Sequence, residues 1–253
     1  MFVTKENTMQ SEKQSPTANR GPVTTGGKGN ILLSLAPLLA VAGGLCLAVT
    51  FWLILVYAPI ETQMRLPQKI FYLHMPLAWW GLISFFLVFA ASIAYLVTRK
   101  DTWDILAGAA AEIGLVLAVL ALVTGSIWGK PAWGVWWTWD ARLTTTLVMC
   151  FIYAGYLILR GLDIHPGRRA RLAAVVGIVA FLDVPLVFLS ARLWSYIHPP
   201  SISLEPEMKL TLIASIASFA LLWAGLLAFR YRLGRDERQV DMLAAERLMR
   251  SEQ

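Results

Sequence analysis

The sequence contains few charged residues for its length. Charged side chains make up 15% of the 253 residues, and hydrophobic side chains make up 57%. Soluble domains contain about 25% charged residues, so this composition excludes an ordinary soluble fold. It is typical of a protein that crosses a membrane several times.

Residues for several kinds of chemistry are also scarce. The two cysteines, Cys46 and Cys150, lie in apolar stretches and form no CxxC pair, and no CxxCH sequence is present. These absences exclude thiol redox chemistry and covalent haem attachment, and we expect both cysteines to be small buried apolar residues. The GxxxxGK[ST] loop that binds nucleotide phosphates is absent too, so any ATP hydrolysis belongs to a partner. We expect no enzymatic activity from this chain.

The sequence is rich in long apolar segments. A helix needs about 20 apolar residues to cross a bilayer. Six segments have about this length, at residues 31–58, 76–98, 105–127, 143–160, 172–191 and 210–229. We therefore predict an all-α fold with six transmembrane helices in one domain, residues 31–230. The first span is too long for a cleaved signal peptide. Residues 1–30 should form a disordered tail, and residues 231–253 a second tail that is either solvated or a short charged helix.

The distribution of lysine and arginine predicts the orientation of the chain. Sixteen of the 22 residues lie in the two tails and in the connections after the second and fourth spans, and six lie elsewhere. Because cytoplasmic loops carry the excess of positive charge, both termini should be cytoplasmic. The loops after the first, third and fifth spans then face outward. The net charge of +6 follows from this topology, so we expect contact with membrane lipids and no nucleic-acid binding.

One outer loop is rich in tryptophan. Its sequence is WGKPAWGVWWTWD, and its indole rings belong to Trp128, Trp133, Trp136, Trp137 and Trp139. A belt of interfacial aromatics explains isolated tryptophans, namely Trp52, Trp79, Trp80, Trp103, Trp194 and Trp223. It accounts poorly for five in one short loop. We expect Pro131 and the glycines to fold the chain back so that several rings converge on a flat, apolar ligand.

Two of the three histidines share this outer face. His74 precedes the second span and His198 follows the fifth, whereas His165 lies in a cytoplasmic loop and should be solvated. Two neutral imidazoles can hold a haem iron from opposite faces, although an interfacial histidine can also be a simple polar anchor. Asp140 can cap the next helix, set the polar edge of a ligand site, or do both, and Arg142 can pair with a propionate.

Two carboxylates lie inside predicted spans, where a charge is costly. Glu112 lies among small residues, which favours an interhelical hydrogen bond. Asp183 lies two residues before Pro185, and its role stays open between a structural and a functional one.

The motif residues together resemble a known family. The run WGKPAWGVWWTWDARLT, within the segment 128–144, resembles the WWD signature of the haem-handling membrane proteins of cytochrome c maturation. The matching positions are Trp128, Gly129, Trp133, Gly134, Trp137, Trp139, Asp140, Arg142, Leu143 and Thr144. Six spans and two outer histidines are similar to one branch of that family, the haem exporter protein C proteins, over about residues 31–230.

This resemblance implies a function and a site. Such proteins hold non-covalent haem b at the outer face of the bacterial inner membrane and deliver it to a periplasmic haem chaperone, cytochrome c maturation protein E. They act with a small single-span membrane protein and the subunits of an ABC transporter. From the shared outer face of the histidines and the tryptophan loop, we expect the iron ligands to be His74 and His198. We expect the haem contacts to be Trp128, Trp133, Trp136, Trp137, Trp139, Asp140 and Arg142.

Two other functions stay open. A subunit that translocates haem across the membrane needs a polar or wide route, for which the spans offer only Glu112 and Asp183. A membrane cytochrome b-type redox subunit usually buries its histidines within the spans, whereas two histidines lie at the outer edge here.

Overall fold

The chain folds into long helices that run along one axis. The computed structural model describes residues 35–62, 64–193 and 204–251. The helices are α2 (Ala36–Trp52), which continues through a π-helical turn (Leu53–Tyr57), a short 3-10 helix (Leu66–Ile70), α3 (Phe71–Thr98), α4 (Asp101–Trp133), α5 (Ala141–Arg160), α6 (Pro166–Ala180), α7 (Asp183–Leu193) and α8 (Pro206–Ser251). Six helical segments of the described residues are long and apolar enough to cross a membrane. The predicted all-α fold with six spans is therefore confirmed.

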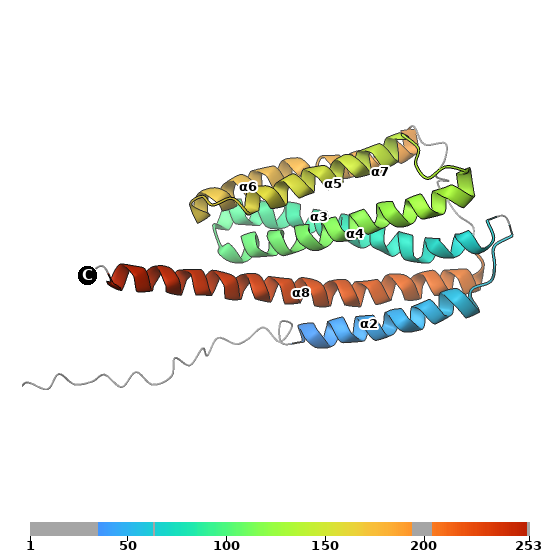
Figure 1. The fold of residues 1–253 in the computed structure, drawn as a ribbon, viewed down its shortest axis with the longest axis horizontal. Coiled ribbons are helices and arrows are strands. Elements are labelled where there is room, and N and C mark those ends of the chain that lie inside the picture. Colours follow the sequence, from blue (N-terminus) through green and yellow to red (C-terminus); the bar gives the residue numbers. More distant parts are fainter. Residues whose placement is uncertain (1–34, 63, 194–203, 252–253) are drawn as a thin grey trace, which may run out of the picture.

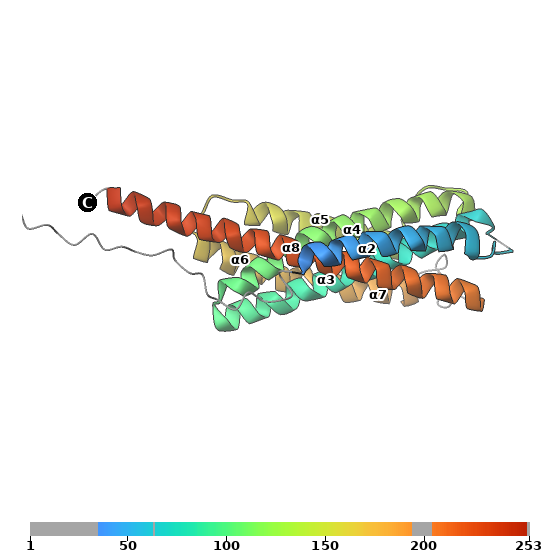
Figure 2. The ribbon, with the colours of Figure 1, turned by 90° about the horizontal axis from the view of Figure 1, so that it is seen from below.

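The helices are arranged in layers, as Figure 1 shows. The helices α5, α6 and α7 form one layer, α3 and α4 form the next, and α8 and then α2 follow. We call the end where α4 stops at Trp133 and α5 starts at Ala141 the tryptophan end. The opposite end, where α3 stops at Thr98 and α5 stops at Arg160, is the arginine end. The start of α2 and the end of α8 both lie toward the arginine end (Figures 1 and 2).

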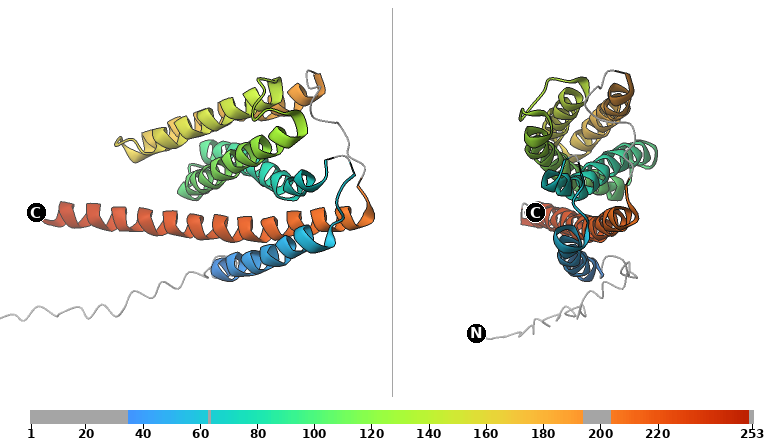
Figure 3. Two further views of the ribbon diagram at one scale, coloured as in Figure 1. Left: turned by 45° about the vertical axis from the view of Figure 1, so that its right-hand side comes forward. Right: turned by 90° about the vertical axis from the view of Figure 1, so that its right-hand side faces the viewer.

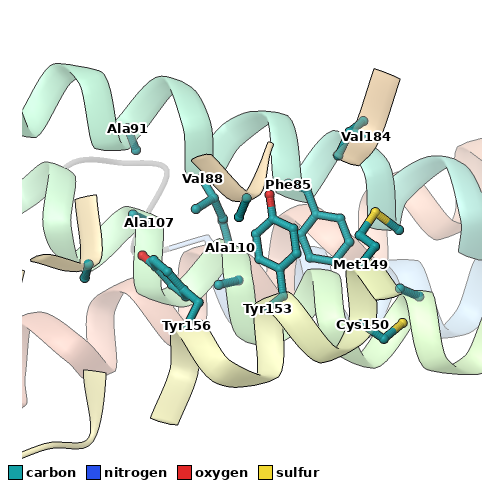
Figure 4. Close-up of a cluster of buried hydrophobic side chains, with 14 of the residues drawn as sticks. Phe85, Val88, Ala91, Ala107, Ala110, Met149, Cys150, Tyr153, Tyr156 and Val184 are labelled. Atoms are coloured by element: carbon teal, nitrogen blue, oxygen red, sulfur yellow. The ribbon is translucent and has the colours of Figure 1, made fainter. Parts of the chain in front are cut away.

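The main core lies between α3, α4, α5 and α6. Figure 4 shows the ring of Phe85 against that of Tyr153, and their centroids are 3.7 Å apart in a stacked arrangement. Small residues of α4, Ala107, Ala110 and Ala111, are almost completely buried beside them. Small side chains let helix backbones approach closely in a membrane, where packing replaces the hydrophobic effect. This packing fixes α3 and α4 as the frame against which the other helices lie.

The segment predicted as one span at residues 172–191 is two helices, α6 and α7. Pro185 lacks the N–H that would reach the carbonyl of Phe181 in a continuous helix. That carbonyl instead accepts a hydrogen bond from the backbone N–H of Val184 at 3.1 Å. Asp183, left open by the sequence, begins α7 with a buried Oδ2 that has no hydrogen-bond partner among the described residues.

Helix α8 continues far beyond the other helices at the arginine end (Figure 2). At 46 residues it is about 69 Å long, so the tail from residue 231 is helical, one of the two forms that the sequence left open. Arg230 of α8 donates to both carboxylate oxygens of Glu112 at 2.6 and 2.8 Å. The interhelical role expected for Glu112 is thus observed, as a salt bridge.

Candidate functional site

The tryptophan segment is helical in its first half, which corrects the predicted boundary. The sequence placed the end of this span at residue 127, but α4 continues to Trp133. Pro131 removes only one hydrogen bond so near the helix end, and the turn closes at Gly134 instead. Gly134 has a φ of 78° and donates its N–H to the carbonyl of Lys130 at 3.0 Å. A left-handed residue at this position favours glycine, so Gly134 is where the chain folds back.

Asp140 starts the following helix. Its Oδ1 accepts hydrogen bonds from the backbone N–H groups of Arg142 and Leu143 at 2.9 and 3.0 Å, and its Oδ2 accepts one from Thr138 at 2.8 Å. A carboxylate here satisfies N–H groups that have no partner within the helix. The capping role predicted for Asp140 is confirmed, and it fixes the direction in which α5 and Arg142 leave the loop.

His74 lies in the first turns of α3 and reaches across to α4. Its Nδ1 is 3.0 Å from the carbonyl of Ala121 and 3.2 Å from Oγ1 of Thr124. A carbonyl can only accept a hydrogen bond, so this contact places a proton on Nδ1 and, in a neutral imidazole, selects the tautomer protonated there. The lone pair then lies on Nε2, the arrangement found in histidines that ligate metals.

One face of α4 is shaped to hold two predicted site residues. Ala121, Gly125 and Gly129 follow each other at one-turn intervals and therefore lie on the same face. A Cβ at Gly125 would lie 3.1 Å from Cε1 of His74, and a Cβ at Gly129 would lie 3.2 Å from Cε3 of Trp133. The two missing side chains leave the space in which the imidazole and the indole lie.

These residues border a cavity near the tryptophan end, between α3, α4, α5, α7 and α8. Its volume is about 420 Å³, within the usual size range of small-molecule sites. Four residues predicted from the sequence line it together: His74, Trp128, Trp133 and Arg142. The rest of the lining is largely apolar and includes Phe71, Met75, Ala78, Trp79, Leu82, Ala118, Leu122, Leu143, Met149, Val187, Phe188, Leu204 and Leu212. Along α3 alone, the lining from Phe71 to Leu82 extends about 16 Å.

Arg142 is the charged residue among those that line the cavity. Its guanidinium has no hydrogen bond and no ion pair with any residue in the described ranges. A cation in a largely apolar cavity favours an anionic partner, and a guanidinium can hold a carboxylate through two hydrogen bonds. The cavity therefore suits a ligand with a large apolar body and an acidic edge.

The other predicted site residues lie elsewhere. Trp136 and Trp139 are on the surface, 58% and 77% exposed. Trp137 is half-buried, with its ring 5.8 Å from that of Trp139 in an edge-on contact, and the Ser126 hydroxyl donates to the carbonyl of Trp136 at 2.7 Å. Contact between haem and any of these three rings stays a prediction. His198 lies outside the described residues, so its role also stays a prediction.

Sequence reasoning missed several walls of the cavity. Trp79 was expected in an interfacial belt, but it lines the cavity. Trp80 and Trp223 were expected in the same belt, yet their rings pack 4.9 Å apart, and Trp223 donates to Ser84 at 2.8 Å. These two tryptophans join α3 to α8. Met149 and Phe188 carried no signal of their own, because their nearness to His74 depends on how the helices pack.

The fold and the cavity define a polytopic membrane protein with a ligand-sized, largely apolar cavity near one end of its helix bundle. The family model described as Heme exporter protein C matches residues 29–246, and the chain belongs to this family.

Curated relatives agree with this assignment. The chain is 36% identical over 202 residues to Heme exporter protein C of Bradyrhizobium diazoefficiens, covering 76% of each chain. It is 35% identical over 200 residues to the Escherichia coli (strain K12) protein of the same name, covering 78% of this chain and 82% of the relative. For the Rhodobacter capsulatus protein of that name the identity is 33% over 184 residues, covering 70% of this chain and 76% of the relative.

Proposed function

We propose that this chain binds haem b non-covalently in the cavity and delivers it to a periplasmic haem chaperone during cytochrome c maturation. The observation that carries the proposal is that His74, Trp128, Trp133 and Arg142 line one largely apolar cavity of about 420 Å³. The printed names of the relatives, Heme exporter protein C, support haem as the cargo.

His74 is the proposed iron ligand within the described residues. The contact from Nδ1 to the carbonyl of Ala121, at 3.0 Å, orients the ring and leaves the lone pair on Nε2. An axial imidazole is a usual ligand of haem iron. His198 is the proposed second ligand, on the basis of the sequence.

Arg142 is proposed to hold the propionates. It lies at the start of α5, near the tryptophan end, whereas Leu82 and Ala118 line the cavity deeper in the spans. A haem bound with its propionates at Arg142 would place its apolar edge among those deeper residues. Trp128 and Trp133, whose ring centroids are 6.1 Å apart, offer apolar contact to the macrocycle.

The exposed rings of Trp136 and Trp139 are proposed to meet the chaperone. Large aromatic side chains supply much of the binding energy in protein interfaces. Trp136 and Trp139 belong to the loop that follows Trp133 in the cavity wall. The position of the loop beside the haem would let a partner reach the cargo without entering the bundle.

The proposed location is the bacterial inner membrane, with the tryptophan end on the periplasmic side. The chain has six candidate spans, and the excess of lysine and arginine lies in the segments predicted to be cytoplasmic. ABC transporter subunits and a small single-span membrane protein are proposed as partners, with nucleotide hydrolysis assigned to the transporter.

The cavity residues can be tested by haem content. The protein is purified from membranes, and its haem is quantified by absorbance for Arg142→Met, Arg142→Lys and Trp133→Ala. We expect both Arg142→Met and Trp133→Ala to retain less haem, and Arg142→Lys to retain an intermediate amount. Losing one large aromatic contact corresponds to about 1.5–3 kcal/mol.

Trp103→Ala is the matched control, because Trp103 lies at the other end of α4, away from the cavity. Its haem content should equal that of the unchanged protein. Unaltered haem content in Arg142→Met and in Trp133→Ala would contradict the assignment of this cavity.

A further inference from the structure

The cavity is bordered by two aromatic residues that are also half exposed on the outside of the helix bundle. Trp79 of α3 and Phe188 of α7 both line it, and they are 53% and 52% exposed. Both lie inside apolar segments that can cross a membrane, Leu66–Thr98 and Pro166–Ser190. Exposed side chains in such a segment would meet hydrocarbon, and residues of both α3 and α7 line the cavity beside them.

Trp79 lies deeper than the polar end of the cavity. Trp79 follows His74 in α3, which places it about 7 Å further into the span. Arg142, at the start of α5, marks the level where a carboxylate can be bound. Trp79, in the cavity wall, thus lies at the depth of the acyl chains next to that level.

Helix α7 is the part of the cavity wall that is least firmly held by its neighbours. It packs on α5, and the turn at Phe181 and Leu182 separates it from α6. The ring of Phe181 is stacked on Phe89 of α3 at 4.5 Å, which anchors the turn itself. A helix that begins at an anchored break can tilt about that break. Seen from the end in the right view of Figure 3, α5 and α7 lie above α3 and α4.

We propose that haem enters and leaves the cavity sideways, from the outer leaflet of the membrane, by passing between Trp79 and Phe188 while α7 tilts away from α3. This inference rests on the proposed function. Haem is a flat amphiphile with an apolar macrocycle and acidic propionates at one edge. Along this route the macrocycle stays in an apolar medium, while the propionates stay near the headgroups until they reach Arg142. A carboxylate therefore avoids the costly passage through the hydrocarbon interior.

The experiment links α3 to α7 across the proposed entrance. In a background with Cys46→Ala and Cys150→Ala, the pair Trp79→Cys and Phe188→Cys is joined by a bismaleimide whose linker can be cleaved by reduction. Haem-free protein in lipid nanodiscs is mixed with vesicles that contain haem, and the rise of the Soret band is followed in time. The same background with either single cysteine, treated with the same reagent, is the control.

We expect the cross-linked protein to load at least about tenfold more slowly than both single-cysteine controls, and cleavage of the linker to restore the rate. Protein that is cross-linked after loading should keep its Soret band and should lose haem to an acceptor more slowly. Equal loading rates before and after cleavage would overturn the lateral route while leaving haem binding itself intact. A protein that develops no Soret band in any form would instead overturn the proposed function.

A second variant tests the route without cross-linking. Phe188→Ala removes one ring from the entrance and should speed loading severalfold. Phe151→Ala removes a ring that is 69% exposed but does not line the cavity, so its loading rate should not change. Equal loading rates in Phe188→Ala and Phe151→Ala would contradict the entry of haem beside Phe188.

Discussion

Replacement of Gly125 by alanine should weaken haem binding through the position of His74. The added Cβ would lie 3.1 Å from Cε1 and 3.5 Å from Nδ1 of the imidazole. The first separation is shorter than an ordinary contact between carbon atoms, so the ring must move by a few tenths of an ångström. That movement strains the 3.0 Å contact from Nδ1 to the carbonyl of Ala121, which orients the ring.

The loss of haem affinity in Gly125→Ala can be estimated from known effects of such hydrogen bonds. Disturbing the hydrogen bond behind a ligating histidine lowers metal affinity by about 10–100-fold. Each tenfold step corresponds to about 1.4 kcal/mol. We therefore expect the dissociation constant of haem, measured by titration of the Soret band in the purified protein, to rise by about 10–100-fold in Gly125→Ala.

Gly44→Ala is the matched control for this measurement. Gly44 also lies within a helix, and a Cβ there would have no atom within 4 Å. Alanine is about 0.5–1 kcal/mol more favourable than glycine inside a helix, so neither variant should unfold for reasons of propensity. If the haem dissociation constant of Gly125→Ala is within twofold of that of Gly44→Ala, His74 is not the ligand held by this contact.

Three further predictions concern the stability of the helix bundle and its orientation in the membrane. Asp140→Ala should destabilise the start of α5 by about 1 kcal/mol, whereas Asp140→Asn keeps a capping oxygen and most of that stability, as thermal unfolding in detergent can measure. Asp104→Ala should cost about 3–5 kcal/mol because it leaves the largely buried Arg160 without its partner at 2.6 Å, and adding Arg160→Met should recover part of that loss. Equal stabilities of the single and double variants would contradict this account. Reporters fused after residues 135 and 240 should report periplasm and cytoplasm respectively, and a cytoplasmic signal at residue 135 would exclude delivery to a periplasmic chaperone.

The fold was predictable because six apolar segments satisfy a simple length requirement. Their boundaries were harder, and the end of α4 shows why. Glycine and proline, as at Gly129 and Pro131, are typical of the end of a helix. Here Gly129 leaves room for the ring of Trp133, and Pro131 is so near the end of α4 that it destabilises the helix little. Only Gly134 adopts the left-handed backbone that ends the helix.

The site was predictable where a motif gathered its residues in one segment. Trp128, Trp133 and Arg142 belong to that segment, and they line the cavity with His74. The deeper walls come from distant parts of the sequence, such as Met149 of α5 and Phe188 of α7, and helix packing alone brings them together. The break between α6 and α7 did have a local signal, since Pro185 removes the hydrogen bond to Phe181.

The most direct test of the central claim is the Soret absorbance of purified His74→Gly with and without added imidazole. Free imidazole can occupy the space that the side chain leaves and can ligate the iron in its place. The account predicts that His74→Gly loses most of the bound haem, and that imidazole restores both the haem content and the position of the Soret band. A His74→Gly protein with an unchanged haem content and spectrum in the absence of imidazole would contradict the account.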